Sequence, residues 1–188
     1  MEALERATRV ATPPSEEPLS LAEAREHLRV DDSLEDPVIS RAIAAARQFA
    51  EAFLHRKLCT TGLELQLSGF PSGQIDLPFP PLQAAASVTY VDTAGEEQEL
   101  LFASGDFQAD TVSEPGRIYP CYGQSWPTPR SQPAAVTVAF TAGYGAASAV
   151  PDQVKQAMLL HVGALYADRE AAEVPEATKN LLWPLRSW

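Results

Sequence analysis

Apolar residues recur at steps of three and four in three stretches of the chain, a spacing typical of amphipathic helices. The first stretch, residues 20–29, begins with Ser20-Leu21-Ala22-Glu23, a capping box whose side chains satisfy free backbone N–H groups. The third, residues 152–168, is apolar around most of its circumference, which predicts burial on more than one side. The second covers residues 34–57, with apolar positions at Ile39, Ala42, Ile43, Ala46, Phe49, Ala50, Phe53 and Leu54. We expect one shared helical core, in or near which lie Phe49, Phe53, Val154, Met158 and Leu165.

Between residues 60 and 141 the period changes to two, as expected for strands with one buried face. Leu63, Leu65 and Leu67 alternate with polar residues, and Asp92-Thr93-Ala94-Gly95 predicts the turn of a hairpin. The order of elements predicts an α+β protein with an antiparallel β region inserted between the second and third helices. We expect residues 19–170 to form one domain.

The two ends of the chain differ in character from this domain. Residues 1–18 end in Thr-Pro-Pro-Ser-Glu-Glu-Pro, and prolines block regular hydrogen bonding, so a flexible arm is predicted. Residues 171–188 form a tail with a dense apolar end, which contains Leu181, Leu182, Trp183, Pro184, Leu185, Arg186 and Trp188. Either this tail is a short helix folded back on its own subunit, or it is an arm that docks on a partner. We favour the arm, because so many large apolar groups at a chain end are hard to leave in water.

Charge and composition narrow the classes of function. The chain has 188 residues and a formal net charge of −11, which argues against a protein that coats nucleic acid. No apolar run is long enough for a membrane span, and the first residues lack the apolar centre of a secretory signal. The only two cysteines, Cys59 and Cys121, are expected to be free thiols in a reducing cytoplasm.

A metal site is the first candidate for chemistry. His55, Cys59, Cys121 and His161 contain the ligand types of a zinc site. Structural zinc sites normally bring their ligands in close pairs, however, and here the second pair is widely separated. We therefore expect no metal and no other cofactor.

A nucleophile or a phosphate loop is equally weakly supported. Cys121 with His161, or Ser125 alone, could supply a nucleophile, but Ser125 lacks the glycine pattern of a nucleophile elbow. Gly143-Tyr144-Gly145 lacks the third glycine of a dinucleotide loop and the lysine of a P-loop. Its simpler role is a sharp turn with positive φ at glycine. The sequence therefore predicts that the protein is not an enzyme.

Two further features belong to loops of the β region. Glu114-Pro115-Gly116-Arg117 predicts a type II turn with Pro115 and Gly116 at its centre. Trp126 lies in a proline-flanked loop, where it either caps the sheet or anchors a partner. We favour the cap and keep the alternative as a candidate contact between subunits.

Several short motifs together resemble the head–tail connector (adaptor) proteins of long-tailed bacteriophages and of phage-derived gene transfer agents. The similar segments are Ser113-Glu114-Pro115-Gly116-Arg117-Ile118, Ser125-Trp126-Pro127, residues 136–140, Thr141-Ala142-Gly143-Tyr144-Gly145, and Pro151 with the apolar helix that ends at Tyr166-Ala167-Asp168-Arg169-Glu170. The resemblance covers about residues 18–170.

This resemblance implies a structural virion protein, with the helical bundle and inserted β region forming the subunit of a ring of twelve copies. The ring would bind the portal protein on one side and the next head-completion or tail-completion protein on the other. DNA would pass through its lumen without specific binding, and no membrane would be involved. The expected location is the head–tail junction, after assembly in the cytoplasm of the bacterial host.

The resemblance also suggests where partners bind. The tail residues Leu181 to Arg186, with Trp188, would dock on the portal or an adjacent subunit and not on their own core. Leu159, Tyr166 and Trp126 are the candidates for contacts between subunits. Two alternatives stay open: another tail-completion or stopper-type assembly protein, and a small enzyme.

Overall fold

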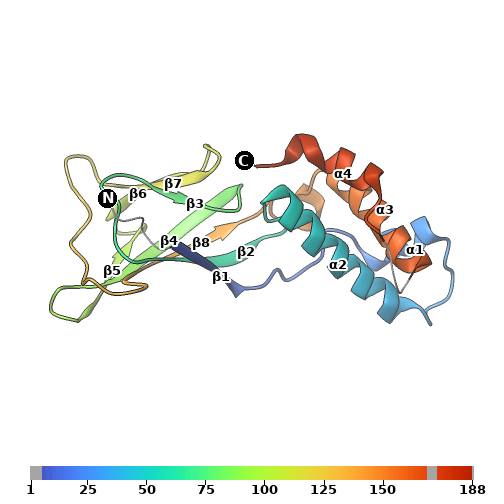
Figure 1. Ribbon diagram of the computed structural model, residues 1–188, viewed down its shortest axis with the longest axis horizontal. Helices are drawn as coiled ribbons and strands as arrows, with labels where there is room; N and C mark the ends of the chain where they lie inside the picture. The colour runs from blue at the N-terminus through green and yellow to red at the C-terminus, as the bar shows by residue number, and fades with distance from the viewer. Residues whose placement is uncertain (1–5, 169–172, 188) are drawn as a thin grey trace. The chain divides into compact units, whose positions relative to one another are not determined.

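The computed structural model describes residues 6–168 and 173–187, which form two compact units (Figure 1). The helical unit contains residues 15–59 and the chain from Tyr144 onward. The β unit contains residues 60–143 together with the segment that ends at Pro14. Because the chain leaves the helices for the β region and then returns, the predicted α+β class with an inserted antiparallel region is confirmed.

Four α-helices build the helical unit: α1 (Leu21–Leu28), α2 (Asp36–Leu54), α3 (Asp152–Ala167) and α4 (Glu176–Leu182). Two short 3₁₀ turns, η1 (Ala147–Ala149) and η2 (Trp183–Leu185), accompany them. Ser20 caps α1 through the predicted box, since its hydroxyl accepts from the Glu23 N–H and the Glu23 carboxylate accepts from the Ser20 N–H. The shared core is also as predicted, with Val154 and Met158 buried at its centre. Phe49, Phe53 and Leu165 pack against it from positions that are partly exposed.

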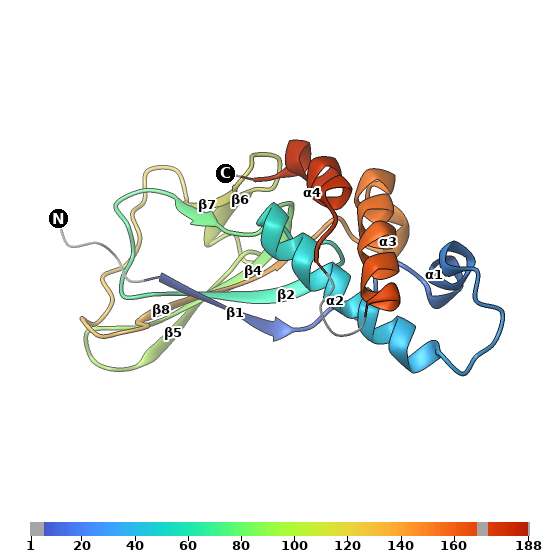
Figure 2. The same cartoon turned by 45° about the vertical axis from the view of Figure 1, so that its right-hand side comes forward.

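Helix α3 is apolar nearly all round because other helices of the same chain surround it. It packs against α1, α2 and α4, and Figure 2 shows it lying beside α2 and α4. Ala157, Met158 and Val162 are fully buried by these neighbours. Its apolar circumference therefore needs no second subunit to explain it.

In the part of the β unit that the structure describes, eight strands form two antiparallel sheets. The larger sheet has the order β1-β2-β8-β4-β5 and the smaller one the order β3-β7-β6. The strands are β1 (Arg6–Thr12), β2 (Thr61–Leu67), β3 (Ile75–Leu77), β4 (Leu82–Val91), β5 (Glu97–Leu101), β6 (Phe107–Asp110), β7 (Gly116–Pro120) and β8 (Val136–Ala142). Burial alternates strictly along β2 and β8, which places one face of each strand in a core shared by both sheets.

The predicted flexible N-terminal arm is wrong for the residues that the structure describes. Arg6–Thr12 is an edge strand that pairs antiparallel with β2, from Arg6 opposite Leu67 to Thr12 opposite Gly62. The prolines that suggested flexibility lie just after this strand, where they end it. The segment itself reads Arg-Ala-Thr-Arg-Val-Ala-Thr, too polar to show a buried face, because an edge strand has little to bury. Residues 1–5 of the predicted arm lie outside the described residues.

The predicted type II turn at Glu114-Pro115-Gly116-Arg117 is also wrong. Gly116 is the first residue of β7, paired with Leu77, and its φ is not in the positive range that such a turn requires at this position. A Cβ added there would overlap the Leu82 side chain, with 2.6 Å to its Cδ2 atom. Glycine is needed at this position because the Leu82 side chain of β4 leaves no room for a Cβ, and not because of the backbone φ.

A buried carboxylate joins the end of α2 to the segments around it. The Glu51 side chain is only 6% exposed, and it pairs with Lys57 at 2.7 Å and with Arg47 at 3.5 Å. Its other oxygen accepts a hydrogen bond from the Leu58 N–H at 3.3 Å. Arg47 in turn pairs with Glu17, in the segment before α1, at 2.7 Å. The network holds the start, middle and end of the first helical segment together.

We predict that Glu51→Ala lowers the free energy of unfolding by about 3–5 kcal/mol, because it removes a buried carboxylate shared by two partly buried cations and the Leu58 N–H. Chemical denaturation followed by circular dichroism measures the change. Glu176→Ala is the matched control, since Glu176 pairs with Lys179 in an exposed position and its removal costs about 1 kcal/mol or less. Equal effects of the two substitutions would contradict the role assigned to Glu51.

Candidate partner-binding surfaces

The C-terminal segment folds back onto its own helical unit, which corrects the expectation that it docks only on a partner. Leu182 is fully buried in the helical core, and Leu181 and Leu185 pack against it. The Thr178 hydroxyl donates to the Ala157 carbonyl at 3.2 Å, inside the α3–α4 contact. The backbone of the tail is then fixed by a bond from the Ser187 N–H to the Leu54 carbonyl, 2.9 Å long. Of the two alternatives for the tail, the described residues therefore adopt the short helix folded back on its own subunit.

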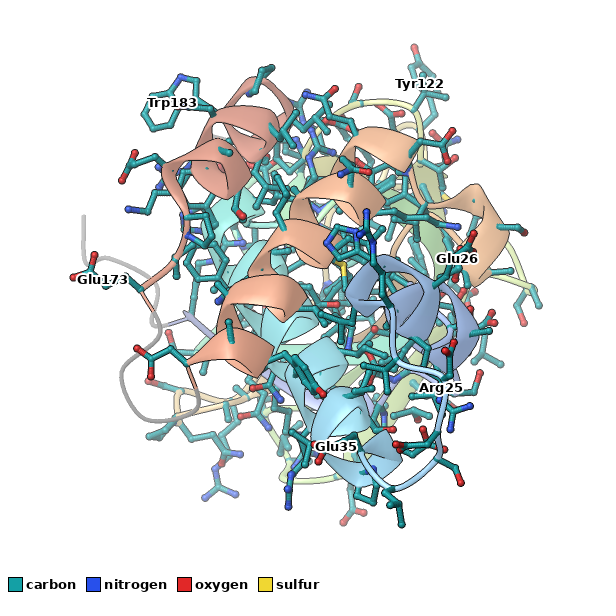
Figure 3. All side chains as sticks on the ribbon, turned by 90° about the vertical axis from the view of Figure 1, so that its right-hand side faces the viewer. Arg25, Glu26, Glu35, Tyr122, Glu173 and Trp183 are labelled. Atoms are coloured by element: carbon teal, nitrogen blue, oxygen red, sulfur yellow. The ribbon has the colours of Figure 1, made fainter. Side chains whose placement is uncertain are left out.

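Part of the tail nevertheless remains at the surface. Trp183 is 55% exposed, and its ring projects away from the ribbon in Figure 3. The Arg186 guanidinium lies over the Phe53 ring at 5.4 Å and near the Trp183 ring at 5.8 Å. Pro184 is exposed beside them. We call Phe53, Trp183, Pro184 and Arg186 the C-terminal aromatic patch.

The aromatic patch is pre-ordered by contacts within the subunit. The Phe53 and Trp183 ring centroids are 6.2 Å apart, and Arg186 contacts His55 through a 3.1 Å nitrogen–nitrogen approach. Arg56 also fixes η2, because its guanidinium donates to the Leu185 carbonyl at 2.7 Å. A tryptophan and an arginine held in place at the surface are the residue types most often found at the centre of protein interfaces. From the sequence, Phe53 was expected only as a core residue. Its contact with Arg186 was not predicted, because that contact exists only when the tail folds back onto α2.

Trp126 caps the β core and is not available as an intersubunit contact, which corrects that assignment. It is 9% exposed, stacks on Phe70 at 5.2 Å and donates its indole N–H to the Gly73 carbonyl at 2.6 Å. Leu159 and Tyr166 on α3 are half-buried against their own core. Trp188, the last of the predicted docking residues, lies outside the described residues.

The candidate metal ligands are not gathered into a site. No group of three or more His, Cys, Asp and Glu side chains in the described parts of the chain is placed to hold an ion. Cys59 is buried in the helical core, and burial raises the pKa of its thiol to about 11. Cys121 belongs to the β unit, where its thiol donates to the Gly105 carbonyl.

The candidate nucleophiles are likewise ordinary structural residues. Ser125 is exposed in the loop that precedes Trp126. His161 is buried on α3, with its ring edge-on to Phe49 at 5.0 Å and no hydrogen-bond partner at Nδ1. Gly143 and Gly145 have φ of 123° and 122°, so the predicted glycine turn is confirmed. Among the described helices, none is long and apolar enough to cross a membrane.

Two exposed apolar loop tips were not predicted from the sequence. Tyr122 is 99% exposed and Val112 is 91% exposed, and the Tyr122 side chain projects from the ribbon in Figure 3. Both lie at the ends of the small β3-β7-β6 sheet, before β7 and after it. The sequence signal of this turn was the glycine directly after Tyr122, and the structure shows that Gly123 has a positive φ.

Comparison with known proteins identifies what this architecture is similar to. Residues 18–100 match the family of phage gp6-like head–tail connector proteins. The neck of an empty gene transfer agent particle, computed with C6 symmetry, contains a chain with TM-score 0.81 and 24% identity, over 97% of this chain and 96% of that one. A chain of the native gene transfer agent virion has TM-score 0.79 and 24% identity, over 96% and 95%. No curated protein matches the sequence significantly.

A third structure, the neck of the native particle computed with C12 symmetry, contains a chain with TM-score 0.71 and 26% identity. The alignment covers 98% of this chain and 96% of that chain. The family match and these neck structures confirm the resemblance to head–tail connector proteins that the sequence motifs indicated.

We predict that Leu182 and Trp183, although adjacent, differ in their contribution to stability. Leu182→Ala should lower the free energy of unfolding by about 2–5 kcal/mol, because it opens a cavity in the core. Trp183→Ala should lower it by about 1 kcal/mol or less, since the ring is 55% exposed and makes its contacts with Phe53 and Arg186 at the surface. Denaturant titration of both variants measures the difference. If both substitutions were nearly neutral, the tail would not be part of the fold.

We also predict that His161 makes stability depend on pH. Burial lowers the pKa of His161, so the unfolded chain binds a proton at a pH where the folded chain does not. Stability is then lost as pH falls from the unfolded value of about 6.5 towards the lower folded value. Thermal unfolding between about pH 8 and pH 5 should show a smaller decrease for His161→Leu than for the natural chain. An identical decrease in the two proteins would contradict the role of His161 in the pH dependence.

Proposed function

Because its first half matches the head–tail connector family and its whole length has the fold of a neck protein, we propose that this chain is a subunit of a head–tail connector ring in the neck of a phage or gene transfer agent particle. The observation that carries the proposal is the combination of the two matches, since one is of sequence and the other of fold. The fold match extends over nearly the full length of both chains, which supports one shared role for the whole chain.

The ring itself follows from the symmetry of the similar particles. Their necks were computed with C6 and C12 symmetry, both of which place identical chains around one axis. We infer a homo-oligomeric ring of twelve copies, in line with the expectation from the sequence. Such a ring requires a heterologous interface, in which two different surfaces of the subunit meet.

The partners we propose are the portal protein on one side and the next head-completion or tail-completion protein on the other. The portal contact is assigned to the C-terminal aromatic patch. This replaces the docking arm expected from the sequence, because the buried half of the tail holds Trp183 and Arg186 in fixed positions. A pre-ordered patch binds without the entropy cost of folding an arm.

The remaining surface suits a passage for DNA. A net charge of −11 gives few sites for phosphate binding, so DNA can pass through the ring and be retained without adhering to its wall. The function is therefore structural: the ring links capsid to tail and forms part of the DNA passage.

Binding to purified portal protein tests the assignment of the patch. Trp183→Ala should weaken the affinity at least about tenfold, the loss expected for a central aromatic residue. Lys179→Ala, an exposed change in α4, the helix just before Trp183, is the control and should bind like the natural chain. Equal affinities of all three proteins would place the portal contact elsewhere.

Particle assembly tests the connector function as such. Removing the chain from a producing cell should give filled heads without tails, and restoring it should return tailed particles that contain it. Absence of the chain from purified particles would overturn the function. A ring that binds an existing connector but not the portal would identify a stopper-type protein instead.

A further inference from the structure

The five-stranded sheet of the β unit has two open edges, β1 and β5. Each of these strands pairs with one neighbour in the described parts of the chain, and nearly all of its residues are exposed. An open edge presents backbone N–H and C=O groups that can pair with another strand. Natural proteins usually cover such edges or block them, so the side chains along β1 and β5 show which partner each edge can accept.

The outward backbone groups of β5 can be identified from its end. The Leu101 N–H donates to the Asp106 carboxylate, and the Leu101 carbonyl accepts from the Asp106 N–H, so both point away from β4. The Phe102 N–H points the opposite way, towards the Ala86 carbonyl of β4. Because residues two apart in a strand point their backbone groups to the same side, those of Glu97 and Glu99 also face outward.

The same reasoning identifies the outward groups of β1. The Ala135 carbonyl, just before β8, accepts a hydrogen bond from the Val91 N–H of β4. The backbone groups of odd-numbered residues in β8 therefore point towards β4, and those of even-numbered residues point towards β2. In β2, Leu63 and Leu65 are paired with these even-numbered residues, so their backbone N–H and C=O groups point towards β8. The backbone groups of Glu64, between them, therefore point towards β1. Arg9 is opposite Glu64, so Thr8 and Val10 have their backbone groups turned outward.

The two edges carry opposite charges. Strand β1 contains Arg6 and Arg9 and no acidic residue, whereas β5 and the residue before it contain Glu96, Glu97 and Glu99 and no basic residue. Arg9 lies on the face opposite the buried leucines, where it already contacts Glu64. Since Leu100 packs against the core, Glu97 and Glu99 lie on that same outer face of the sheet. A sheet extended from one copy to the next would bring Arg9 beside these carboxylates.

We propose that β1 of one copy pairs with β5 of the next, so that the sheet continues from subunit to subunit. This inference rests on the proposed ring and names one of its interfaces. Neighbours in the sheet are antiparallel throughout, so β1 and β5 run in the same direction and the pairing between copies is parallel. The charges favour this heterologous pairing and disfavour β5 with β5, which would oppose like charges and close a dimer instead of a ring. Pairing would also cover Val10, which is 51% exposed.

Proline substitution removes one outward N–H without touching the bonds inside the subunit. Thr8→Pro blocks the β1 edge and Glu99→Pro blocks the β5 edge. Each variant alone should remain monomeric across a concentration series in which the natural chain assembles, as measured by mass photometry. Mixed together, they should form a dimer of one copy of each and nothing larger, because each supplies the edge that the other lacks.

Thr8→Val and Glu99→Thr are the matched controls, since both keep the N–H and suit a strand. They should assemble, with Glu99→Thr less sensitive to salt. Thermal unfolding of each variant checks that the subunit stays folded. Proline variants that are folded and assemble like the natural chain, or a natural chain that stays monomeric at every concentration, would overturn the edge pairing. Either result would leave the connector function standing, because incorporation into particles measures that function separately.

Discussion

The helical unit depends on the buried carboxylate of Glu51. It lies where α2 ends and the chain turns towards β2, and it is contacted by Arg47, Lys57 and the Leu58 N–H. A buried charge is tolerated only when it is paired and hydrogen-bonded, so all of these contacts must be made together. The segment after Glu51 is also where the tail is attached, through Arg56 to Leu185 and through Leu54 to Ser187. The position of the C-terminal aromatic patch therefore follows from how this end of α2 is fixed.

The tail illustrates how one short segment can serve both stability and recognition. Leu182 and Trp183 are adjacent, yet one is fully buried and the other is 55% exposed. A helix presents successive residues about 100° apart around its axis, so adjacent positions easily fall on different faces. Burial of Leu182 supplies the free energy that orders the segment, and the order places Trp183 beside Phe53 and Arg186. A subunit built this way presents its exposed surface residues in fixed positions before it meets a partner.

The β unit raises the opposite problem, because a subunit with open sheet edges must assemble in one arrangement only. Arg9 and the three glutamates near β5 address this through charge, since like edges repel and unlike edges attract. The acidic balance of the whole chain adds solubility before assembly and leaves few sites for DNA phosphates. Both properties suit the proposed connector ring, in which identical copies surround a passage for DNA.

The sequence by itself determined the α+β class, the three helices expected near residues 20–29, 34–57 and 152–168, the capping box at Ser20, the hairpin at Gly95 and the glycine turn at Gly143. Each of these depends on local periodicity or on the backbone preferences of one or two residues, which a single stretch of sequence records. The motifs were also sufficient to indicate the connector family. Only the tertiary structure decided that Arg6–Thr12 is a strand, that Gly116 is required by the approach of Leu82, and that the tail returns to its own core. These features depend on partners far along the chain, such as Leu67 for Arg6, Leu82 for Gly116 and Leu54 for Ser187. No local pattern can specify a contact whose other half lies on a distant segment, because only folding brings the two together.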